Sequence, residues 1–402
     1  MLTKDMHVDT LLIHSGYDSR ENRDSLSPPL YHSSTFTFES AEQGERRFSG
    51  EEDGNIYSRL ANPTVRILEE RMAILEKGEG ALAFGSGMAA VSAVLFHLTK
   101  TGDHILSSRG IYGCTFALLE MLEEKYHIEH TFSPLQSAEE IESSIRENTA
   151  CIYVETPINP TMEMIDLELV TSVAKRHGIP VVVDNTFSSP YLQNPLEIGA
   201  DYVVHSATKY ISGHGDVIGG VLIGKNKEEL EMIRSTTRKD IGGIMSPFDA
   251  WLLLRGLKTL HVRMERHVEN AKKIASYLKK HPLVEKIYYP GDEESSQYPI
   301  MQKQMKAPGG ILSFTIRGGK NEAQAFMNQL KLIKIAVSLG DAETLIQHPA
   351  TMTHAVVPLD ARLNMGITEN MLRLSVGLEN PDDLIDDLKQ AFSSIKKEIV
   401  TG

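Results

Sequence analysis

The stretch "IPVVVDNTF", residues 179–187, predicts a strand of a parallel sheet that is buried on both faces and ends at Asp184. An unbroken run of valines, without polar alternation, is typical of such a strand. A helix pattern, "DLELVTSVAKRHG" at 166–178, comes directly before it. A second strand pattern, "DYVVHS" at 201–206, follows it. Strand and helix patterns in alternation predict an α/β fold with a mostly parallel sheet.

The same alternation extends toward the N-terminus. Strand patterns occur at 80–84, 104–108 and 150–155, and helix patterns at 87–98 and 115–122. We therefore expect one sheet with helices on both faces. Ligands of such sheets bind at the carboxyl ends of the strands, so the chemistry is expected at that edge.

Three segments are predicted from changes in pattern. Residues 1–60 are rich in polar and turn-forming types, which predicts an extended N-terminal arm that packs on a neighbouring subunit. Residues 61–255 hold the alternating pattern and form a large domain. Near Trp251 the alternation stops, and a long amphipathic helix at 261–280 leads into a smaller α+β domain, residues 256–402.

Composition narrows the classes of function. The chain has 402 residues, 41% of them hydrophobic, and a formal net charge of -13. Nucleic acids and anionic membranes are bound through clustered Lys and Arg, which are absent here, so neither is an expected partner. No apolar run would span a bilayer and no signal-peptide pattern begins the chain, so a cytoplasmic location is expected. Two cysteines, Cys114 and Cys151, provide no disulfide framework.

Two strand ends carry complementary chemistry. Asp184 ends one predicted strand, and the next, in "HSATKYISGHGDVIGG" at 205–220, leads to Lys209. Alone, Asp184 fits an ordinary Asx-turn and Lys209 a surface charge. Together they match the needs of pyridoxal 5'-phosphate (PLP), in which a lysine binds the aldehyde and a carboxylate keeps the pyridine nitrogen protonated.

The remaining parts of PLP also find candidate partners at this edge. The turn "AFGSGMAAV" at 83–91 opens a helix, whose first N–H groups, at Gly87 and Met88, would face the phosphate. Such turns open many helices that bind nothing. Ser206 and Thr208 would add hydroxyl donors, and Tyr112 follows another predicted strand and offers a ring for stacking.

The motifs "NIYSRLANPT", "FGSGMAAV", "ETPINPTM", "VVVDNTF", "HSATKYISGHGDVIGG" and "LRLSVGLE" occur in this order. In this the chain resembles the Cys/Met-metabolism family of PLP enzymes, over about Thr10 to Leu388. The resemblance implies the aspartate-aminotransferase-like fold, fold type I. It also implies a homodimer as the active unit, commonly paired into a tetramer.

Matching positions of the family imply roles for individual residues. Lys209 would be the Schiff-base lysine, Asp184 the partner of the pyridinium, and Tyr112 the stacking ring. The phosphate would be held by Gly87, Met88, Ser206 and Thr208, together with Tyr57 and Arg59 from the neighbouring subunit. Arg373 would bind the substrate carboxylate, with Asn159 and Ser338 beside it.

The family acts on small sulfur amino acids, and one group of residues indicates which. Tyr112 is expected to give a proton to the leaving sulfur, and a phenol above a cationic cofactor can lose its proton near neutral pH. Alone, Cys114 fits a buried structural thiol, but it follows Tyr112 by two positions, and Lys239 and Asp240 resemble the pair that accompanies this cysteine in methionine γ-lyases. The resemblance makes Cys114 a candidate catalytic residue and Lys239 and Asp240 candidate substrate contacts. The predicted reaction is therefore γ-elimination from methionine, and from homocysteine. Cystathionine γ-lyase is the main alternative, followed by O-acetylhomoserine sulfhydrylase and cystathionine γ-synthase.

Other classes of function have weaker support. The turn at 83–91 lacks the glycine spacing of a dinucleotide-binding fingerprint. Nothing marks a histidine partner that would make Cys114 a hydrolase nucleophile. The pairs His348 with His354 and His205 with His214 match no metal-ligand spacing, so structural histidines and no metal are expected.

Overall fold

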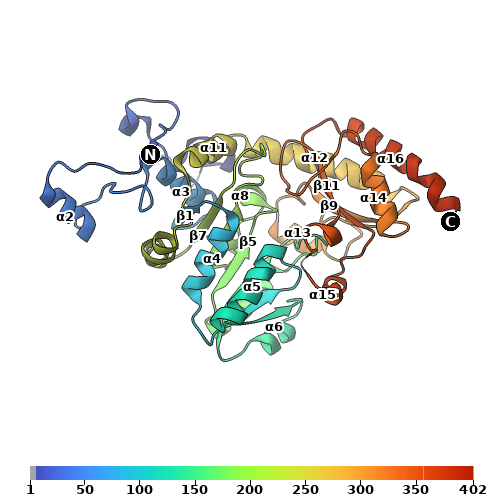
Figure 1. Cartoon of the computed structure of the whole chain (residues 1–402), viewed down its shortest axis with the longest axis horizontal. Coiled ribbons are helices and arrows are strands. Elements are labelled where there is room, and N and C mark those ends of the chain that lie inside the picture. Colours follow the sequence, from blue (N-terminus) through green and yellow to red (C-terminus); the bar gives the residue numbers. More distant parts are fainter. Residues whose placement is uncertain (1–5, 356, 402) are drawn as a thin grey trace.

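A seven-stranded sheet forms the centre of the larger part of the molecule in the computed structural model, which describes residues 6–355 and 357–401 (Figure 1). Its strands, in spatial order, are β1 (Gly80–Phe84), β7 (Gly220–Gly224), β6 (Tyr202–Ser206), β5 (Val181–Asp184), β4 (Thr149–Glu155), β2 (His104–Ser108) and β3 (Glu129–Ser133). Strand β7 runs antiparallel to both neighbours, and the other pairs are parallel. The predicted mostly parallel sheet is confirmed.

Helices cover both faces of this sheet, which explains the apolar runs of its central strands β5 and β6. Val183 and Val203 belong to a core shared with α3 (Pro63–Leu75), α7 (Leu167–His177) and α11 (Pro247–Leu257). Val182 and Val204 face the other way, into a core shared with α4 (Gly87–Leu98), α5 (Gly113–Tyr126) and α10 (Lys227–Ile233). Because alternate side chains of a strand point to opposite faces, both sets must be apolar.

The remaining described helices of this part are short. They are α6 (Ala138–Ser144), α8 (Ser189–Leu192), α9 (Pro195–Ile198) and a π-helical segment (Arg234–Ile241) that continues α10.

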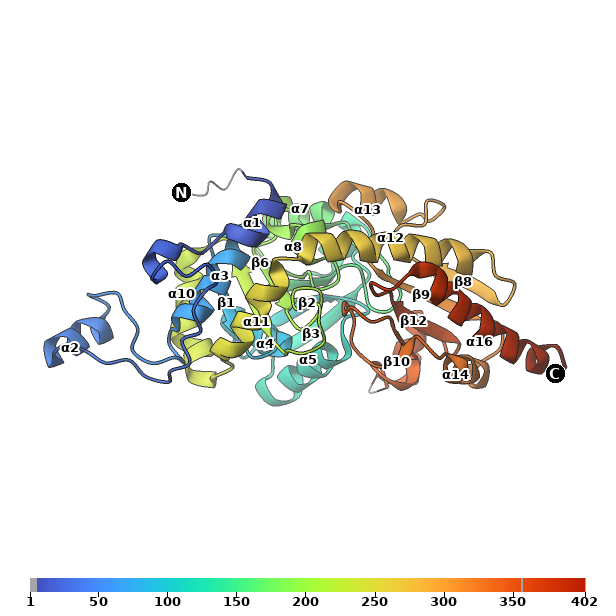
Figure 2. The same cartoon turned by 90° about the horizontal axis from the view of Figure 1, so that it is seen from above.

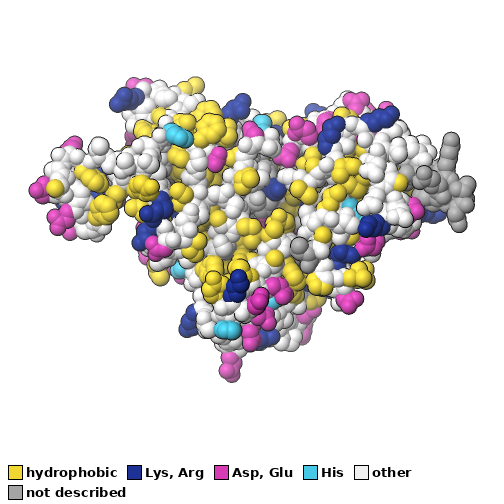
Figure 3. Space-filling model, viewed as in Figure 1, with side chains coloured by type: hydrophobic (Ala, Val, Ile, Leu, Met, Phe, Trp, Pro, Cys, Tyr) yellow, Lys and Arg dark blue, Asp and Glu magenta, His cyan; other side chains and the backbone are white. Residues whose placement is uncertain are grey.

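The prediction that residues 1–60 form one extended arm is wrong for their first part. Helix α1 (Val8–His14) buries Leu11 and Leu12 in the same core as α3, so it belongs to the body of the molecule. A 3-10 turn (Ser19–Asn22) and helix α2 (Ala41–Ser49) follow. The segment with α2 does project from the body (Figures 1 and 2). It carries apolar side chains at its surface (Figure 3), among them Phe48, which is 70% exposed.

A second, five-stranded sheet forms the smaller C-terminal part. Its spatial order is β10 (Lys334–Ile335), β11 (Leu345–Gln347), β12 (Met371–Ser375), β9 (Ile311–Ile316) and β8 (Val284–Tyr288). Its helices are α13 (Tyr298–Gln304), α14 (Lys320–Gln329), α15 (Leu359–Asn364) and α16 (Pro381–Thr401), with a 3-10 turn at Pro349–Thr351. The long helix α12 (Leu260–Lys279) lies between the two sheets and contributes to both cores. No helix in the described part of the chain is long and apolar enough to cross a membrane.

Candidate active site

A cavity of about 290 Å³ lies at the carboxyl ends of β4, β5 and β6, where α/β sheets bind their ligands. Strand β12 of the second sheet closes its other side through Arg373. Ten of the residues predicted from the sequence line it: Gly87, Met88, Tyr112, Asn159, Asp184, Ser206, Thr208, Lys209, Ser338 and Arg373.

Asp184 is a carboxylate without a cationic partner in any described ion pair. Its Oδ1 accepts a hydrogen bond from the Thr186 N–H at 3.0 Å, and its Oδ2 accepts one from the Tyr153 hydroxyl at 3.3 Å. Burial raises its pKa, although the Thr186 bonds oppose the shift. A carboxylate in this position is stabilised by a cation placed beside it, such as a pyridinium N–H.

Lys209 is one turn beyond the end of β6, and its Nζ donates to the Ser338 Oγ at 3.0 Å. Burial, and then the charge of Arg373, lower its pKa. Ser338 has a φ of 104°, which residues other than glycine rarely adopt. Such strain is found at functional sites, where surrounding contacts hold it in place. A lysine with a lowered pKa has more of its amine in the neutral, nucleophilic form.

The other end of the cavity is formed by closely packed backbone. A Cβ on Gly220 would lie 2.1 Å from the Ser86 carbonyl oxygen, and one on Gly87 would lie 2.9 Å from the Ser206 Cβ. The first turn of α4 therefore approaches the end of β6 directly. Its N–H groups precede the internal hydrogen bonds of the helix, so they would be free to bind an anion beside the Ser206 and Thr208 hydroxyls.

Arg373 lies on β12 and is only 3% exposed. Its Nη1 donates to the Asn159 Oδ1 at 2.9 Å, and its Nη2 to the Ser338 carbonyl at 2.7 Å. Burial lowers its pKa to about 10, so the guanidinium stays charged at neutral pH. It forms no ion pair with a carboxylate of the described residues, which leaves its charge for an anionic ligand.

Tyr112 precedes α5 and is half-exposed along the cavity wall. Burial, and then the hydrogen bond and charge of Cys114, raise its pKa to about 12, against the opposing charge of Arg373. The chain's own groups thus hold the phenol in its protonated form. Any tendency to ionise near neutral pH must come from a positive charge that binds in the cavity.

Five of the predicted residues lie outside this cavity, and four of them form one group: Tyr57, Arg59, Lys239 and Asp240. The Arg59 Nη1 donates to the Lys239 carbonyl at 2.9 Å, and the Arg59 guanidinium carbon lies 5.5 Å from the centre of the Tyr57 ring. The Lys239 Nζ in turn lies 3.6 Å from the Asp240 Oδ1. Lys239 and Asp240 belong to the π-helical segment, a local structure frequent at functional sites. Cys114 is also absent from the lining residues and is exposed.

Sequence reasoning missed Glu155, Thr186 and Thr353, which also line the cavity. A signal for Glu155 was present, because it ends the strand "ACIYVE" as Asp184 ends "VVVD". It is 4% exposed, and Glu155 and Asp184 are paired in the register of β4 and β5. Burial, and then the charge of Asp184, raise its pKa well above the usual value.

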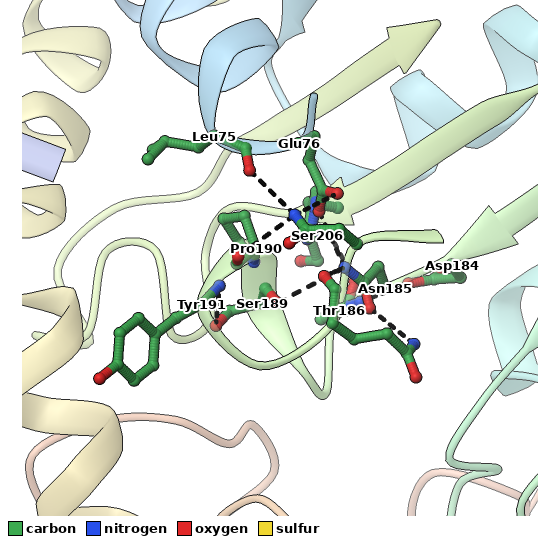
Figure 4. Close-up of polar contacts among 12 residues, drawn as sticks. Leu75, Glu76, Asp184, Asn185, Thr186, Ser189, Pro190, Tyr191 and Ser206 are labelled. Carbon is green, nitrogen blue, oxygen red and sulfur yellow. Dashed lines mark hydrogen bonds and ion pairs between the residues drawn. The ribbon is translucent and has the colours of Figure 1, made fainter. Parts of the chain in front are cut away.

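Below the sheet edge, a buried polar cluster supports the strand ends (Figure 4). The His205 Nε2 lies 2.5 Å from the Glu76 Oε1, and both side chains are at most 1% exposed. The Asn185 amide, next to Asp184, donates to the same Glu76 oxygen at 2.8 Å and to the Gln193 carbonyl at 2.8 Å. His205, one of the candidate metal ligands, is therefore part of an internal hydrogen-bond network.

Replacing Glu76 by leucine is expected to lower the free energy of unfolding by about 1–3 kcal/mol, the usual cost of leaving a buried hydrogen-bonding group without its partner. The change leaves the His205 Nε2 without its partner and removes one of the two acceptors at 2.8 Å from the Asn185 amide. Urea unfolding checks this, with the exposed Glu139→Gln as control, for which a change within about 0.5 kcal/mol is expected. Equal midpoints for both variants would show that the pair contributes nothing.

The other candidate metal histidines also have ordinary partners. The two ring nitrogens of His348 contact the Thr351 hydroxyl at 2.8 Å and the Glu369 carbonyl at 2.7 Å. His354 contacts the Thr353 hydroxyl at 3.0 Å, and His214 the Ser212 carbonyl at 2.7 Å.

Residues 9–393 match the family of Cys/Met metabolism PLP-dependent enzymes. The chain belongs to this family. An L-methionine gamma-lyase from Fusobacterium nucleatum subsp. polymorphum is 48% identical over 98% of this chain and all of that protein. A cystathionine gamma-lyase from Bacillus subtilis is 44% identical over 97% of this chain and all of that protein. The crystal structure of a cystathionine gamma-lyase from Lactobacillus plantarum, complexed with L-serine, has a TM-score of 0.92 and 40% identity, covering 97% of this chain and all of that one.

Membership makes this protein a PLP-dependent enzyme of fold type I, as the sequence predicted. The cavity fits the cofactor. A buried carboxylate without a cation, a lysine with a lowered pKa and a helix N-terminus lie around one space. These three features are complementary to the pyridine nitrogen, the aldehyde and the phosphate of PLP.

Proposed function

We propose that this enzyme is an L-methionine γ-lyase, which converts methionine and water to methanethiol, 2-oxobutanoate and ammonia. One observation carries the choice of substrate. The acidic and basic residues among those lining the cavity are Glu155, Asp184, His205, Lys209 and Arg373. Arg373 suits one carboxylate, and the others have partners or serve the cofactor, so this chain's side of the cavity leaves none for a second charged end on the substrate. Lys239 and Asp240, which a neighbouring subunit would add, are paired with each other at 3.6 Å.

The outer part of the cavity supports an uncharged thioether. Ile218 and Val337 line it and are 65% and 58% exposed. Apolar groups at this position favour the methylthio end of methionine by excluding water from it. Cystathionine would place a second ammonium and carboxylate there, and these would lose hydration without gaining a partner in this chain.

Residues around the cavity would bind each functional part of the cofactor. Asp184 would bind the pyridine nitrogen, Lys209 the aldehyde carbon, and Tyr112 would stack on the ring. The phosphate would be bound by the N–H groups of Gly87 and Met88 with the hydroxyls of Ser206 and Thr208. When bound, PLP withdraws electrons from the substrate's α carbon, which makes loss of the α-proton feasible.

Proton transfer would be divided between two side chains. The Lys209 amine, with its lowered pKa, takes the α-proton, would pass it to the carbon of the cofactor that had been the aldehyde, and, neutral again, takes a β-proton. Tyr112, whose raised pKa keeps it protonated, gives a proton to the sulfur as the Cγ–S bond breaks. Arg373 meanwhile holds the substrate carboxylate, with Asn159 and Ser338 fixing the guanidinium.

We further propose that the active unit is a homodimer. A phosphate group carries close to two negative charges, yet the cations Lys209 and Arg373 are used elsewhere in the cavity. Arg59 and Tyr57 of a neighbouring subunit would supply the missing charge and a hydrogen bond. Lys239 and Asp240, joined to Arg59 within this chain, would enter the neighbour's cavity with them. The projecting segment with α2 would then cover the neighbouring subunit.

Cys114→Ala is expected to lower kcat/KM for methionine about fivefold at neutral pH, because losing one hydrogen bond to Tyr112 costs about 1 kcal/mol. Cys114 raises the pKa of Tyr112, so its removal lowers that pKa. Since Tyr112 acts while protonated, the basic limb of the kcat/KM profile should move to lower pH. Cys151→Ala is the control: it leaves the profile in place. An unmoved limb in Cys114→Ala would exclude this role.

Substrate competition tests the proposed function. The PLP-loaded enzyme receives methionine and cystathionine together, and methanethiol and cysteine are measured as the respective products. A larger kcat/KM for methionine is expected. Predominant release of cysteine, with little methanethiol, would favour the cystathionine γ-lyase reaction, which the 44% identical relative makes the second candidate.

A further inference from the structure

The buried carboxylate of Glu155 joins two loops that line the cavity. Its Oε2 accepts a hydrogen bond from the Tyr112 N–H at 2.8 Å. Its Oε1 accepts one from the Asn159 N–H at 3.3 Å. Both loops reach the cavity wall, and Glu155 itself lies between them at the end of β4.

Each of these loops carries one end of the proposed substrate site. Tyr112 is on the side of the leaving sulfur, and its N–H belongs to the N-cap residue of α5, where a negative charge is favourable to the helix dipole. Asn159 is on the carboxylate side, because its Oδ1 receives the Arg373 Nη1 at 2.9 Å. A short chain of bonds therefore connects Arg373, Asn159, Glu155 and Tyr112.

We propose that Glu155 is a positioning residue that sets the separation between the acid Tyr112 and the carboxylate-binding Arg373. The proposal rests on the proposed function, because the two ends acquire these roles only with an amino-acid substrate. It explains why a carboxylate occupies a place where burial is costly. Two backbone N–H donors need two acceptor oxygens on one side chain, and a glutamine offers only one.

The neighbouring charges are consistent with an ionised Glu155 in the loaded enzyme. Both N–H bonds and the charge of Arg373 favour the carboxylate form, whereas burial and Asp184 oppose it. A cation bound at Asp184 would remove that repulsion. Glu155 therefore becomes a better acceptor when the cofactor site is filled.

The test uses the PLP-loaded Glu155→Gln enzyme and L-norleucine, which has the length of methionine but no leaving group. Binding is followed through the visible absorbance of the cofactor, and the environment of the ring through its induced circular dichroism. We expect PLP content near that of the wild type, a norleucine Kd about tenfold higher, and an altered dichroism band, because one of two hydrogen bonds is lost. Glu155→Asp, which keeps both acceptors, should recover part of the affinity.

Glu147→Gln is the matched control. Glu147 is exposed just before the same strand and does not line the cavity, so its replacement should leave Kd and dichroism unchanged. Asn159→Ala tests whether Glu155 acts on Arg373 through Asn159, because it removes the side-chain bond to Arg373 while keeping the backbone N–H of residue 159. If so, the double variant Glu155→Gln with Asn159→Ala binds norleucine no more weakly than Asn159→Ala alone.

A wild-type Kd and dichroism band in Glu155→Gln would overturn the proposal. So would additive losses in the double variant, or a loss of PLP and melting temperature alone, which a purely structural role predicts. If Glu155→Gln does not fold, the same comparison is made with Glu155→Asp, where an unchanged Kd and dichroism band would overturn it. Norleucine has no sulfur, so a failure of the methionine assay leaves this test intact and the two outcomes separate.

Discussion

Lys209→Ala is expected to lower kcat for methionine about 10⁴-fold, the upper range for one positioned acid–base group. The same amine binds the aldehyde and moves two protons in the proposed reaction, so no neighbouring group can replace it. Among the described residues of this chain that line the cavity there is no second lysine, and the Lys239 that a neighbouring subunit would add is paired with Asp240. The rate is measured with excess PLP, so that weak cofactor binding does not account for the loss.

The visible spectrum and the melting temperature of Lys209→Ala distinguish a loss of catalysis from a loss of folding. Without the lysine, the visible band of covalently bound PLP should disappear, while the melting temperature stays close to that of the wild type. Lys225→Ala, an exposed lysine just after β7, should retain both the band and the rate. A coloured, active Lys209→Ala enzyme would contradict the assignment.

Asp184→Asn is expected to lower kcat/KM about 10²-fold, because a charge-assisted hydrogen bond of about 1.5–3 kcal/mol to the pyridine nitrogen is replaced by a neutral one. The stability of the PLP-free protein should change in the opposite direction. Burial raises the folded-state pKa of Asp184, so its ionised form, present as pH rises through that pKa, costs folding free energy. Asparagine removes this cost.

Thermal unfolding of the wild type and of Asp184→Asn near neutral pH, each with and without PLP, checks the expected effects on stability. Without PLP, Asp184→Asn should unfold at the same or a higher temperature than the wild type. With PLP, the wild type should gain more stability than the variant, since only its carboxylate pairs with the pyridinium. A variant that is less stable without PLP and equally active with it would show that Asp184 is a structural residue.

The sequence predicted five of the seven strands of the central sheet, because most of these are apolar runs, but not β7 or the polar edge strand β3. The valine run ending at Asp184 carries that information locally. Helix α1 was missed because seven residues are too few to show a helical pattern of apolar positions. Its Leu11 and Leu12 are buried by packing against α3, which is distant in the sequence. Packing between residues that are distant in the sequence leaves no local periodic pattern of apolar residues.

For the candidate site too, the sequence predicted the residues that follow a local pattern but not the contacts between distant residues. Asp184 and Lys209 were found because each follows a strand, and topology brings parallel strand ends together. The bond between Arg373 and Asn159 joins residues 214 positions apart, and the pairing of His205 with Glu76 joins two elements without a shared motif. Their chemistry is visible in the sequence, but their partners depend on the assembled fold.

The decisive measurement for methionine γ-lyase activity is the stoichiometry of product formation from methionine by the PLP-loaded wild-type enzyme. Methanethiol, 2-oxobutanoate and ammonia are measured in one reaction, with Lys209→Ala as the blank. Equal amounts of all three are expected from the wild type, and about 10⁴-fold slower formation from the variant. Turnover of cystathionine or O-acetylhomoserine without methanethiol from methionine would contradict this activity.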